Sequence, residues 1–392
     1  MLRLKWNFHT FNHMTLTDCF TQREIFHQPK MWMETYEIVS SKRNEIHSFL
    51  EHNQIKKDTE IVLTGAGTSA FIADTAACLF TRSGYRNARS ISTTDIVSAP
   101  EFFLTPGKKL FISFGRSGDS PESVAAYNIA RELCEGASHL IITCNPDGYL
   151  ARTADKNLDY VIVLPEGTND KSLAMTSSFS SMLVASLLCM NLDSIDEEKA
   201  KLQAAAEFAQ RFLADDVLEQ IQSLTSRKIS RAVFLGSSAL KGVACECHLK
   251  LQELTDGRLM CSFDSFMGLR HGPKAVVNDE TLVVYLLSED PYTRRYELDL
   301  VEQVGLQHNP AGQIIVSTVP SGYDGKGIDF EIDAKPSEAL LSGDYKYVSY
   351  VLIGQLLGYF FSLSNGLDPD TPSVSGTISR VVSGVKIYDY KR

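Results

Sequence analysis

One local pattern occurs twice in this chain, and it restricts the possible folds more than any other feature. Residues 60–77, "EIVLTGAGTSAFIADTAA", and residues 231–248, "RAVFLGSSALKGVACECH", both indicate a β-strand, a Gly/Ser turn and a helix that opens with small residues. In both halves, further short β-branched runs alternate with longer helical stretches, which is typical of parallel sheets covered on both faces. We therefore predict an α/β protein with two tandem domains. Each is a doubly wound (flavodoxin-like), mainly parallel sheet flanked by helices.

The length of 392 residues also favours two domains. An amphipathic stretch at 197–224 separates the copies, and a lead-in helix is expected over 31–52, just beyond Pro29. Strands are expected at 60–65, 89–94, 109–114, 139–144 and 160–165, then at 232–237, 281–287 and 312–318. The predicted units are an N-terminal arm with the start of the lead-in helix (1–44), a first domain (45–200), and a second domain with the C-terminal tail (215–392).

Composition excludes several classes of protein. The net charge of −10 disfavours nucleic acid as a partner, and the eight cysteines have no regular spacing of the kind a secreted disulfide framework shows. The first thirty residues lack an apolar signal region, and the longest apolar run, 182–192, is too short to cross a bilayer and is interpreted as a buried helix. "CECH" at 245–248 lacks metal-ligand spacing. We expect a cytoplasmic protein with no membrane contact, metal or organic cofactor.

The first candidate binding loop is "TGAGTSA", where Ala66, Gly67, Thr68 and Ser69 lie between a strand and a helix. Unpaired N–H groups at a helix start stabilise an anion. The loop also satisfies the loose dinucleotide pattern G-x-G-x-x-A, but the expected acidic residue of the next strand is not clear. A nucleotide site and glycines needed only for packing remain alternatives.

A second loop, "SFGRSGDSPES" at 113–123, follows the third strand of the same half and offers Arg116, Ser117 and Ser120. Strand ends converge in a doubly wound sheet, so both loops are expected to face one ligand, and two hydroxyl-rich loops favour a compact phosphate. The alternative is that Ser120 merely caps the helix that Pro121 begins. A third polar cluster, "MTSSFSS", supplies Thr176 and Ser177, which either cap a helix or line the same crevice.

The candidate acid and base groups lie in the second half, in "HLKLQELTDGRLMCSFDSFMGLRHGPKAVV" at 248–277. Lys250 and Glu253 are three residues apart and share a helix face, and His271 lies in a turn set by Gly-Pro. The simpler interpretations are a solvated ion pair and an ordinary turn. The pattern by itself leaves catalysis open.

The motifs "GAGTSA", "RSGDSPES", "LKLQEL" and "LRHGP", in a duplicated α/β chain, resemble the sugar isomerase (SIS) domain superfamily from about residue 45 to the end. The tandem members are the nearest match, such as the isomerase half of glucosamine-6-phosphate synthase. "REIFHQPKMW", "LMCSFDSFMGLRHGPKA" and "SRVVSGVKIY" are more similar to the AgaS group of amino-sugar catabolism. The glutaminase half of the synthase is absent, which disfavours ammonia transfer from glutamine.

The resemblance implies roles for individual residues. Ala66, Thr68 and Ser69 match the first phosphate-side loop, and Arg116, Ser117 and Ser120 match the second, where Gly115 and Arg116 depart from the superfamily pattern. Glu253 matches the carboxylate that moves a proton between C1 and C2. His271 matches the imidazole of ring opening, which in synthase-like relatives comes from the neighbouring subunit, so a homodimer with shared active sites is implied. The synthase-like C-terminal lysine is replaced by Gly384, with Lys386 two residues on.

The activity implied is isomerisation-coupled deamination of D-galactosamine 6-phosphate to D-tagatose 6-phosphate and ammonia, with a small-molecule sugar phosphate as the ligand. A plain phosphosugar ketose/aldose isomerase or a deglycase would share the proton shift. A sugar-phosphate-sensing regulatory protein is the alternative without catalysis, and a dinucleotide-dependent oxidoreductase is a further class.

Overall fold

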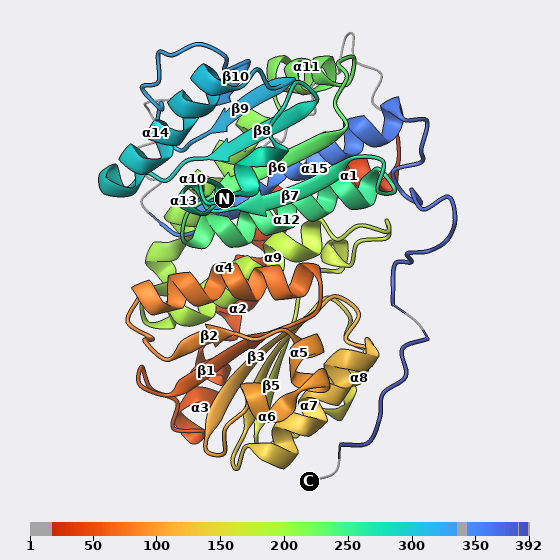
Figure 1. Cartoon of the computed structure of the whole chain (residues 1–392). Helices are drawn as coiled ribbons and strands as arrows, with labels where there is room; N and C mark the ends of the chain where they lie inside the picture. Colours follow the sequence, from red (N-terminus) through yellow and green to blue (C-terminus); the bar gives the residue numbers. More distant parts are fainter. Residues whose placement is uncertain (1–17, 335–342, 383, 391–392) are drawn as a thin grey trace.

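Two parallel five-stranded sheets lie one above the other in Figure 1, with a layer of helices between them. The structure is a computed structural model that describes residues 18–334, 343–382 and 384–390. The first sheet has the strand order β2-β1-β3-β4-β5, and the second has the order β10-β9-β8-β6-β7. Starting from the β7 edge, the second order repeats the first, with β6 in the place of β1 and β8 in the place of β3. This is the flavodoxin-like order, so the predicted fold class is confirmed.

The strands are short and mostly buried. Those of the first sheet are β1 (Glu60–Thr64), β2 (Ala88–Ser90), β3 (Lys109–Gly115), β4 (Ser138–Thr143) and β5 (Asp159–Val163). Those of the second are β6 (Arg231–Gly236), β7 (Met260–Asp264), β8 (Thr281–Leu286), β9 (Gly312–Val316) and β10 (Phe330–Ile332). Each described pairing is parallel, so all strands of a sheet end at the same edge.

A single hydrophobic core joins the facing sides of the two sheets. Leu63 of β1 and Phe234 of β6 belong to the same buried cluster, whereas Val62 and Val233 point to the outer faces and to separate clusters. The inner helices are α2 (Gln28–Ser41), α4 (Thr68–Arg82), α9 (Ser177–Met190), α10 (Ile195–Phe212), α12 (Ala239–Leu254) and α15 (Lys346–Ser364). The outer helices include α5 (Thr93–Ser98), α7 (Pro121–Leu133), α13 (Phe266–Leu269) and α14 (Pro291–Gln307).

The N-terminal helices differ from the prediction. The lead-in segment is two helices, because the chain leaves helical geometry at Lys42 between α2 and α3 (Arg43–His52). A further helix, α1 (Phe20–Phe26), lies in the part predicted as an arm. The apolar spacing continues across Lys42, so periodicity does not show the break. The rest of the arm, residues 1–17, lies outside the described residues, and the domain boundaries stay a prediction.

Three other predictions need correction. The expected strand at 89–94 ends at Ser90, because the hydroxyl of Ser92 accepts the backbone N–H of Asp95 and begins α5. The amphipathic stretch at 197–224 is two helices, α10 and α11 (Asp215–Leu224). The short strands β7 and β10 were not expected. Both lie at sheet edges, where the alternating or continuous apolar pattern is weak.

Two apolar helices fill the centre of the molecule. Every residue of α9 is buried, in agreement with the predicted buried helix. Within the described part of the chain, α15 is also long and apolar enough to span a bilayer, and the sharply bent pair of α9 with the segment 192–212 passes the same test together. However, 83% of the apolar window of α15 is buried inside the protein, where α15 packs against α12. A core helix therefore explains its composition.

The first loop of each domain has the same unusual backbone conformation. Gly67, before α4, has φ 56° and ψ −125°, and Ser238, before α12, has φ 52° and ψ −123°. This region suits glycine and is strained for serine. The second domain has its own carboxylate here, because Glu297 of α14 is hydrogen-bonded by the side chain of Ser237 and, at 2.7 Å, by the backbone N–H of Ser288.

Candidate active site at the domain interface

The two predicted binding loops meet at the carboxyl edge of the first sheet, because β1 and β3 are neighbours in parallel register. In the first loop, a Cβ on Gly65 would lie 2.4 Å from the Cβ of Ser69, so only glycine fits this close approach. Gly67 is exposed and Ala66 is half-buried, whereas the side chains of Thr68 and Ser69 are buried at the start of α4.

The second loop is braced from the loop that follows β4. The Asn145 side chain donates to the backbone O of Ser117 at 3.0 Å, and the Thr143 hydroxyl donates to the backbone O of Arg116 at 3.4 Å. The Ser120 hydroxyl donates to the Ser123 hydroxyl at 2.6 Å and makes no bond to the backbone at the start of α7. Ser120 therefore stands at the cap position without satisfying the helix N–H groups, which remain available to a ligand.

Helix α12 brings three charged side chains of the second domain to this edge. It runs antiparallel to α4, because Gly242 near its start packs on Thr75, while Lys250 near its end donates to the Thr68 hydroxyl at 3.2 Å. Lys250 Nζ also lies 2.7 Å from Glu253 Oε2 and 3.4 Å from Glu246 Oε1. The predicted Lys250–Glu253 pair is thus not a solvated contact. It lies at the domain interface against the first loop.

Burial sets the protonation of this cluster. Lys250 and Glu246 are 1% and 0% exposed, and Glu253 retains 19% exposure. Burial raises the pKa of Glu246 to about 8, although Lys250 opposes this shift. Burial by itself would lower the pKa of Lys250. The neighbouring carboxyl groups of Glu246 and Glu253 outweigh this effect, so the pKa of Lys250 is raised. Burial thus favours the protonated form of Glu246, and Glu253 is the member of the cluster that reaches the surface.

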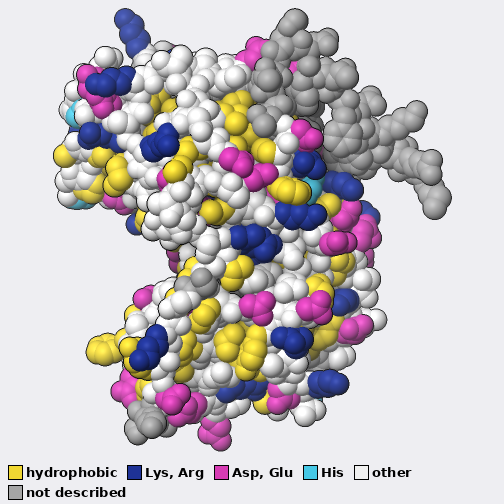
Figure 2. Space-filling view, turned by 90° about the vertical axis from the view of Figure 1, so that its right-hand side faces the viewer, with side chains coloured by type: hydrophobic (Ala, Val, Ile, Leu, Met, Phe, Trp, Pro, Cys, Tyr) yellow, Lys and Arg dark blue, Asp and Glu magenta, His cyan; other side chains and the backbone are white. Residues whose placement is uncertain are grey.

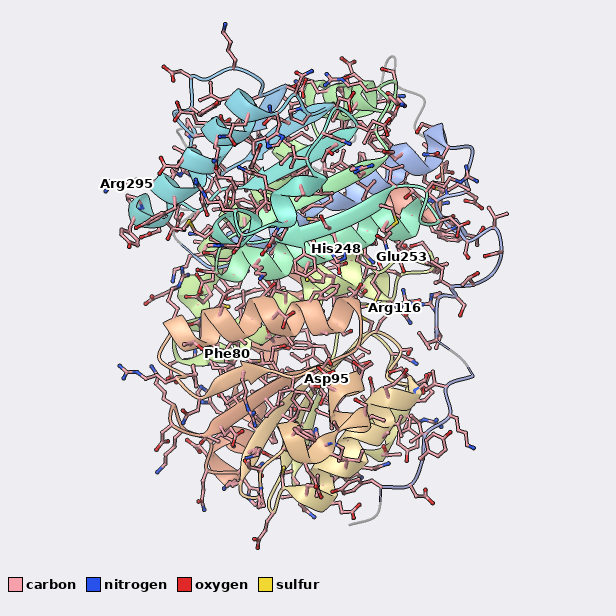
Figure 3. The ribbon with its side chains drawn as sticks, viewed as in Figure 1. Phe80, Asp95, Arg116, His248, Glu253 and Arg295 are labelled. Carbon is pink, nitrogen blue, oxygen red and sulfur yellow. The ribbon has the colours of Figure 1, made fainter. Side chains whose placement is uncertain are left out.

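Arg116 is buried rather than directed outward. Its guanidinium donates to the backbone O of Leu173 at 3.4 Å and to the backbone O of Arg380 in the C-terminal tail. Burial lowers its pKa, and the charges of Asp170 and Glu253 oppose that shift. Figure 3 shows Arg116 and Glu253 on the same side of the molecule, where the two domains meet.

The third predicted cluster surrounds an internal carboxylate. Asp170, which is fully buried, accepts the backbone N–H groups of Thr176, Ser177 and Ser178 at 2.9–3.0 Å, and the Thr176 hydroxyl at 3.2 Å. Asp170 therefore caps α9, whereas the Thr176 side chain at the N-cap position makes no cap hydrogen bond to the helix. The Ser177 hydroxyl is buried without a partner among the described residues.

His271 is not brought to the other candidates within one chain. It is exposed in the turn after α13, and its N–H donates to the backbone O of Gly268. This turn lies at the start of α12, because Asp264, against which Gly268 packs, is 3.6 Å from Lys241. Glu253 lies twelve residues further along α12, about 18 Å along its axis.

The remaining candidates have no place in this cluster. Lys386 is exposed in the tail, with its ammonium 4.7 Å from the centre of the Tyr388 ring. In the "CECH" segment, Cys247 faces the backbone of α15, whereas His248 packs on Phe263 of β7, so these side chains diverge. No group of three His, Cys, Asp or Glu residues suited to a metal occurs within residues 18–334, 343–382 and 384–390.

Three residues of the site were missed from the sequence. Glu246 could have been found, since it lies one helical turn before Lys250. Asp170 lies six to eight residues before its partners, which is outside the usual cap spacing, and the partners of Arg380 lie more than 200 residues away and depend on the tertiary fold.

Comparisons with known proteins show the family of this chain. Residues 54–192 match the family model of the SIS domain. An AgaS protein of Streptomyces coelicolor is 40% identical over 94% of this chain and 95% of its own length. D-galactosamine-6-phosphate deaminase AgaS of Escherichia coli is 37% identical over 96% of this chain and 97% of its own. The structure of tagatose-6-phosphate ketose/aldose isomerase from Escherichia coli matches with a TM-score of 0.87 and 34% identity, over 97% of this chain and 99% of that one.

Proposed function

The chain belongs to the AgaS family of SIS-domain proteins, and we propose that it catalyses the deamination of D-galactosamine 6-phosphate, with water, to D-tagatose 6-phosphate and ammonia. The observation that carries this proposal is the contact of Lys250, the partner of Glu253, with Thr68 of the first loop. It joins a loop suited to a phosphate with a carboxylate suited to proton transfer. A sensor would need only the first of these.

The phosphate would lie between the first and second loops. Backbone N–H groups at the starts of α4 and α7, together with the hydroxyl of Ser117, are the donors available there. The Ser120 hydroxyl would join them by turning away from Ser123. Binding energy from the phosphate is remote from the reacting carbons, so it can be used to hold C2 against Glu253. Thr176 and Ser177 would support this site through α9 without direct contact.

The proton shift would take place at Glu253. After the ring opens, the carboxylate removes the proton from C2 of the aldehyde. The electron pair forms the C1=C2 bond of an enolamine, and the aldehyde oxygen takes up a proton from solvent. Return of the first proton to C1, with loss of one proton from nitrogen to solvent, leaves a ketimine at C2. Water adds to the ketimine, and the C–N bond breaks to release ammonia and leave the ketose. Lys250 would hold the Glu253 carboxyl group in place through their 2.7 Å ion pair, and the buried Glu246 lies 3.4 Å from the same ammonium group.

Ring opening needs a second proton carrier, and His271 would supply it from a partner subunit. Within one chain this residue lies too far from Glu253, and it is exposed, so it is available to another molecule. Figure 2 shows that the surface is hollowed between the two domains, which leaves room for a partner. The proposed assembly is a homodimer in which each site uses Glu253 of one chain and His271 of the other.

The direct test is to incubate the protein separately with galactosamine 6-phosphate, glucosamine 6-phosphate and tagatose 6-phosphate, and to measure ammonia and ketose. Ammonia with tagatose 6-phosphate from the first substrate alone would support the proposal. Interconversion of aldose and ketose without ammonia would instead assign a plain isomerase. Binding without any turnover would assign a sensor.

A further inference from the structure

The C-terminal strap, defined as residues 369–382 and 384–390, connects the two domains along one side of the molecule, and it descends on the right-hand side of Figure 1. Near its start, the backbone N–H of Val374 donates to Asp256, three residues beyond Glu253. Near its end, the Tyr390 hydroxyl donates to Glu101 of the first domain at 2.8 Å. The strap therefore passes the edge where Glu253 and Arg116 lie.

Two arginines attach the middle of the strap to the first domain: Arg380 of the strap and Arg116 of the second loop. Of the described residues from Val374 to Val382, Arg380 alone is not exposed. Its guanidinium donates to the backbone O of Asp170 at 2.7 Å and to the side chain of Asn169 at 2.8 Å. Its own backbone O accepts the buried guanidinium of Arg116. Arg116 thus binds the strap directly, and both arginines bind the segment 169–173.

Asp170 makes this attachment rigid. Its carboxylate is committed to the start of α9, through three backbone N–H groups and two hydroxyls, so its backbone O is a fixed acceptor for Arg380. Leu173, whose backbone O accepts Arg116, also donates its N–H to the backbone O of Asp370 in the strap. The strap therefore binds the segment 169–173 at both of its ends.

We propose that Arg116 is a positioning residue that fastens the C-terminal strap across the mouth of the active site, with Arg380 as its reciprocal anchor, and that it does not bind the substrate phosphate. Its buried guanidinium is directed at two backbone carbonyls, and phosphate is left to the N–H groups and hydroxyls of the loops. The strap would close over bound sugar phosphate; this consequence, but not the fastening, rests on the function proposed above.

Limited proteolysis of the full-length protein tests the fastening without any substrate. Chymotrypsin would be used to cut the strap at the exposed Tyr388, and the C-terminal fragment would be followed by intact mass. Loss of charge-assisted hydrogen bonds by R380A is expected to raise the rate of strap cleavage about 10- to 100-fold. R116K keeps the charge but not the planar fork, and should have a similar effect. The matched control is R295A, at the far side of the molecule in Figure 3.

The cleavage rate of the double variant R116K/R380A shows whether the two arginines hold one attachment or make two independent contacts. The double variant should be cleaved no faster than the more sensitive single variant, because both residues hold one attachment. Stabilisation by inorganic phosphate in a thermal shift assay should survive in R116K. Strap cleavage of R380A within twofold of wild type would overturn the proposal. So would loss of phosphate stabilisation in R116K with the strap still protected, since that result would assign Arg116 to the phosphate.

Enzyme assays then test whether the strap closes over the bound sugar phosphate. R380A should lower kcat/KM for galactosamine 6-phosphate about tenfold, with R295A unchanged. An inactive wild type would refute the proposed function and leave the proteolysis result to decide the fastening. An R380A enzyme with a released strap and unchanged kcat/KM would refute the closing of the site alone.

Discussion

Replacement of Glu246 by glutamine tests the assigned protonation of the buried cluster. Burial raises the pKa of Glu246 from 4.5 to about 8, so the folded chain holds a proton there that the unfolded chain has released. The folded state therefore binds more protons between these pH values, and its stability falls as the pH rises through this window. Glutamine has the shape and donor of the protonated acid but no proton to lose.

The size of the effect follows from this difference. Between pH 6 and pH 8 the wild type should lose about 2 kcal/mol of stability through Glu246, and E246Q should not lose this contribution. If the whole chain unfolds together, about 2 kcal/mol corresponds to 2–3 °C in Tm. At pH 6 the two proteins should have nearly equal stability, because the neutral amide replaces a neutral acid.

Thermal unfolding of wild type and E246Q, measured in parallel from pH 5.5 to pH 8.5, gives the difference in Tm at each pH. Contributions from other titrating groups, such as the buried His27, cancel in this difference. The wild type should fall below E246Q as the pH rises. A constant difference would show that Glu246 does not titrate here. A variant less stable by 3 kcal/mol or more at pH 6 would show that Glu246 is ionised and paired with Lys250.

The remaining predictions concern the reaction, the assembly and the loop backbone. E253Q should lower kcat about 10²- to 10⁴-fold with little change in KM, as for loss of a general base; an equal loss of substrate binding would make the carboxylate structural. Mixing E253Q and H271N homodimers under conditions of subunit exchange should restore about a quarter of wild-type activity, and no recovery would argue against shared sites. S238G should stabilise the protein by about 1 kcal/mol through relief of backbone strain, whereas G67S should destabilise it by a similar amount. Denaturant unfolding measures both, and equal effects of the same sign would contradict the repeated conformation.

The duplicated pattern predicted the fold class because each strand of the central sheets is a compact apolar run between turn residues. The runs at 109–114 and 139–144 are buried on both faces and could be read directly. The strand β7 could not, because its side chains are half-buried to exposed and its segment contains Gly-Arg and several polar residues. Helix ends such as Lys42 depend on packing of neighbouring helices, which periodicity does not encode.

The candidate site was predictable where its residues are neighbours along the chain. Lys250 and Glu253 share one helix turn, and Thr68 follows a recognisable loop. The partner of Arg116 was not predictable, because the Arg380 carbonyl lies more than 250 residues away and reaches it only through the strap. The separation of His271 from Glu253 likewise depends on the direction in which α12 runs between the domains.

The side chain of Glu297 makes the corresponding loops of the two domains chemically different. It bridges the ends of β6 and β8 in the second domain, which correspond to the ends of β1 and β3 in the first domain. The second domain therefore places a carboxyl group of its own chain at the loops that correspond to the proposed phosphate loops of the first domain. Under the proposed function, one copy of the duplicated fold would bind the phosphate, and the other copy would have its corresponding loops joined by Glu297. A sugar phosphate in solution would then have a single site in each chain, and its binding curve should show one site per chain.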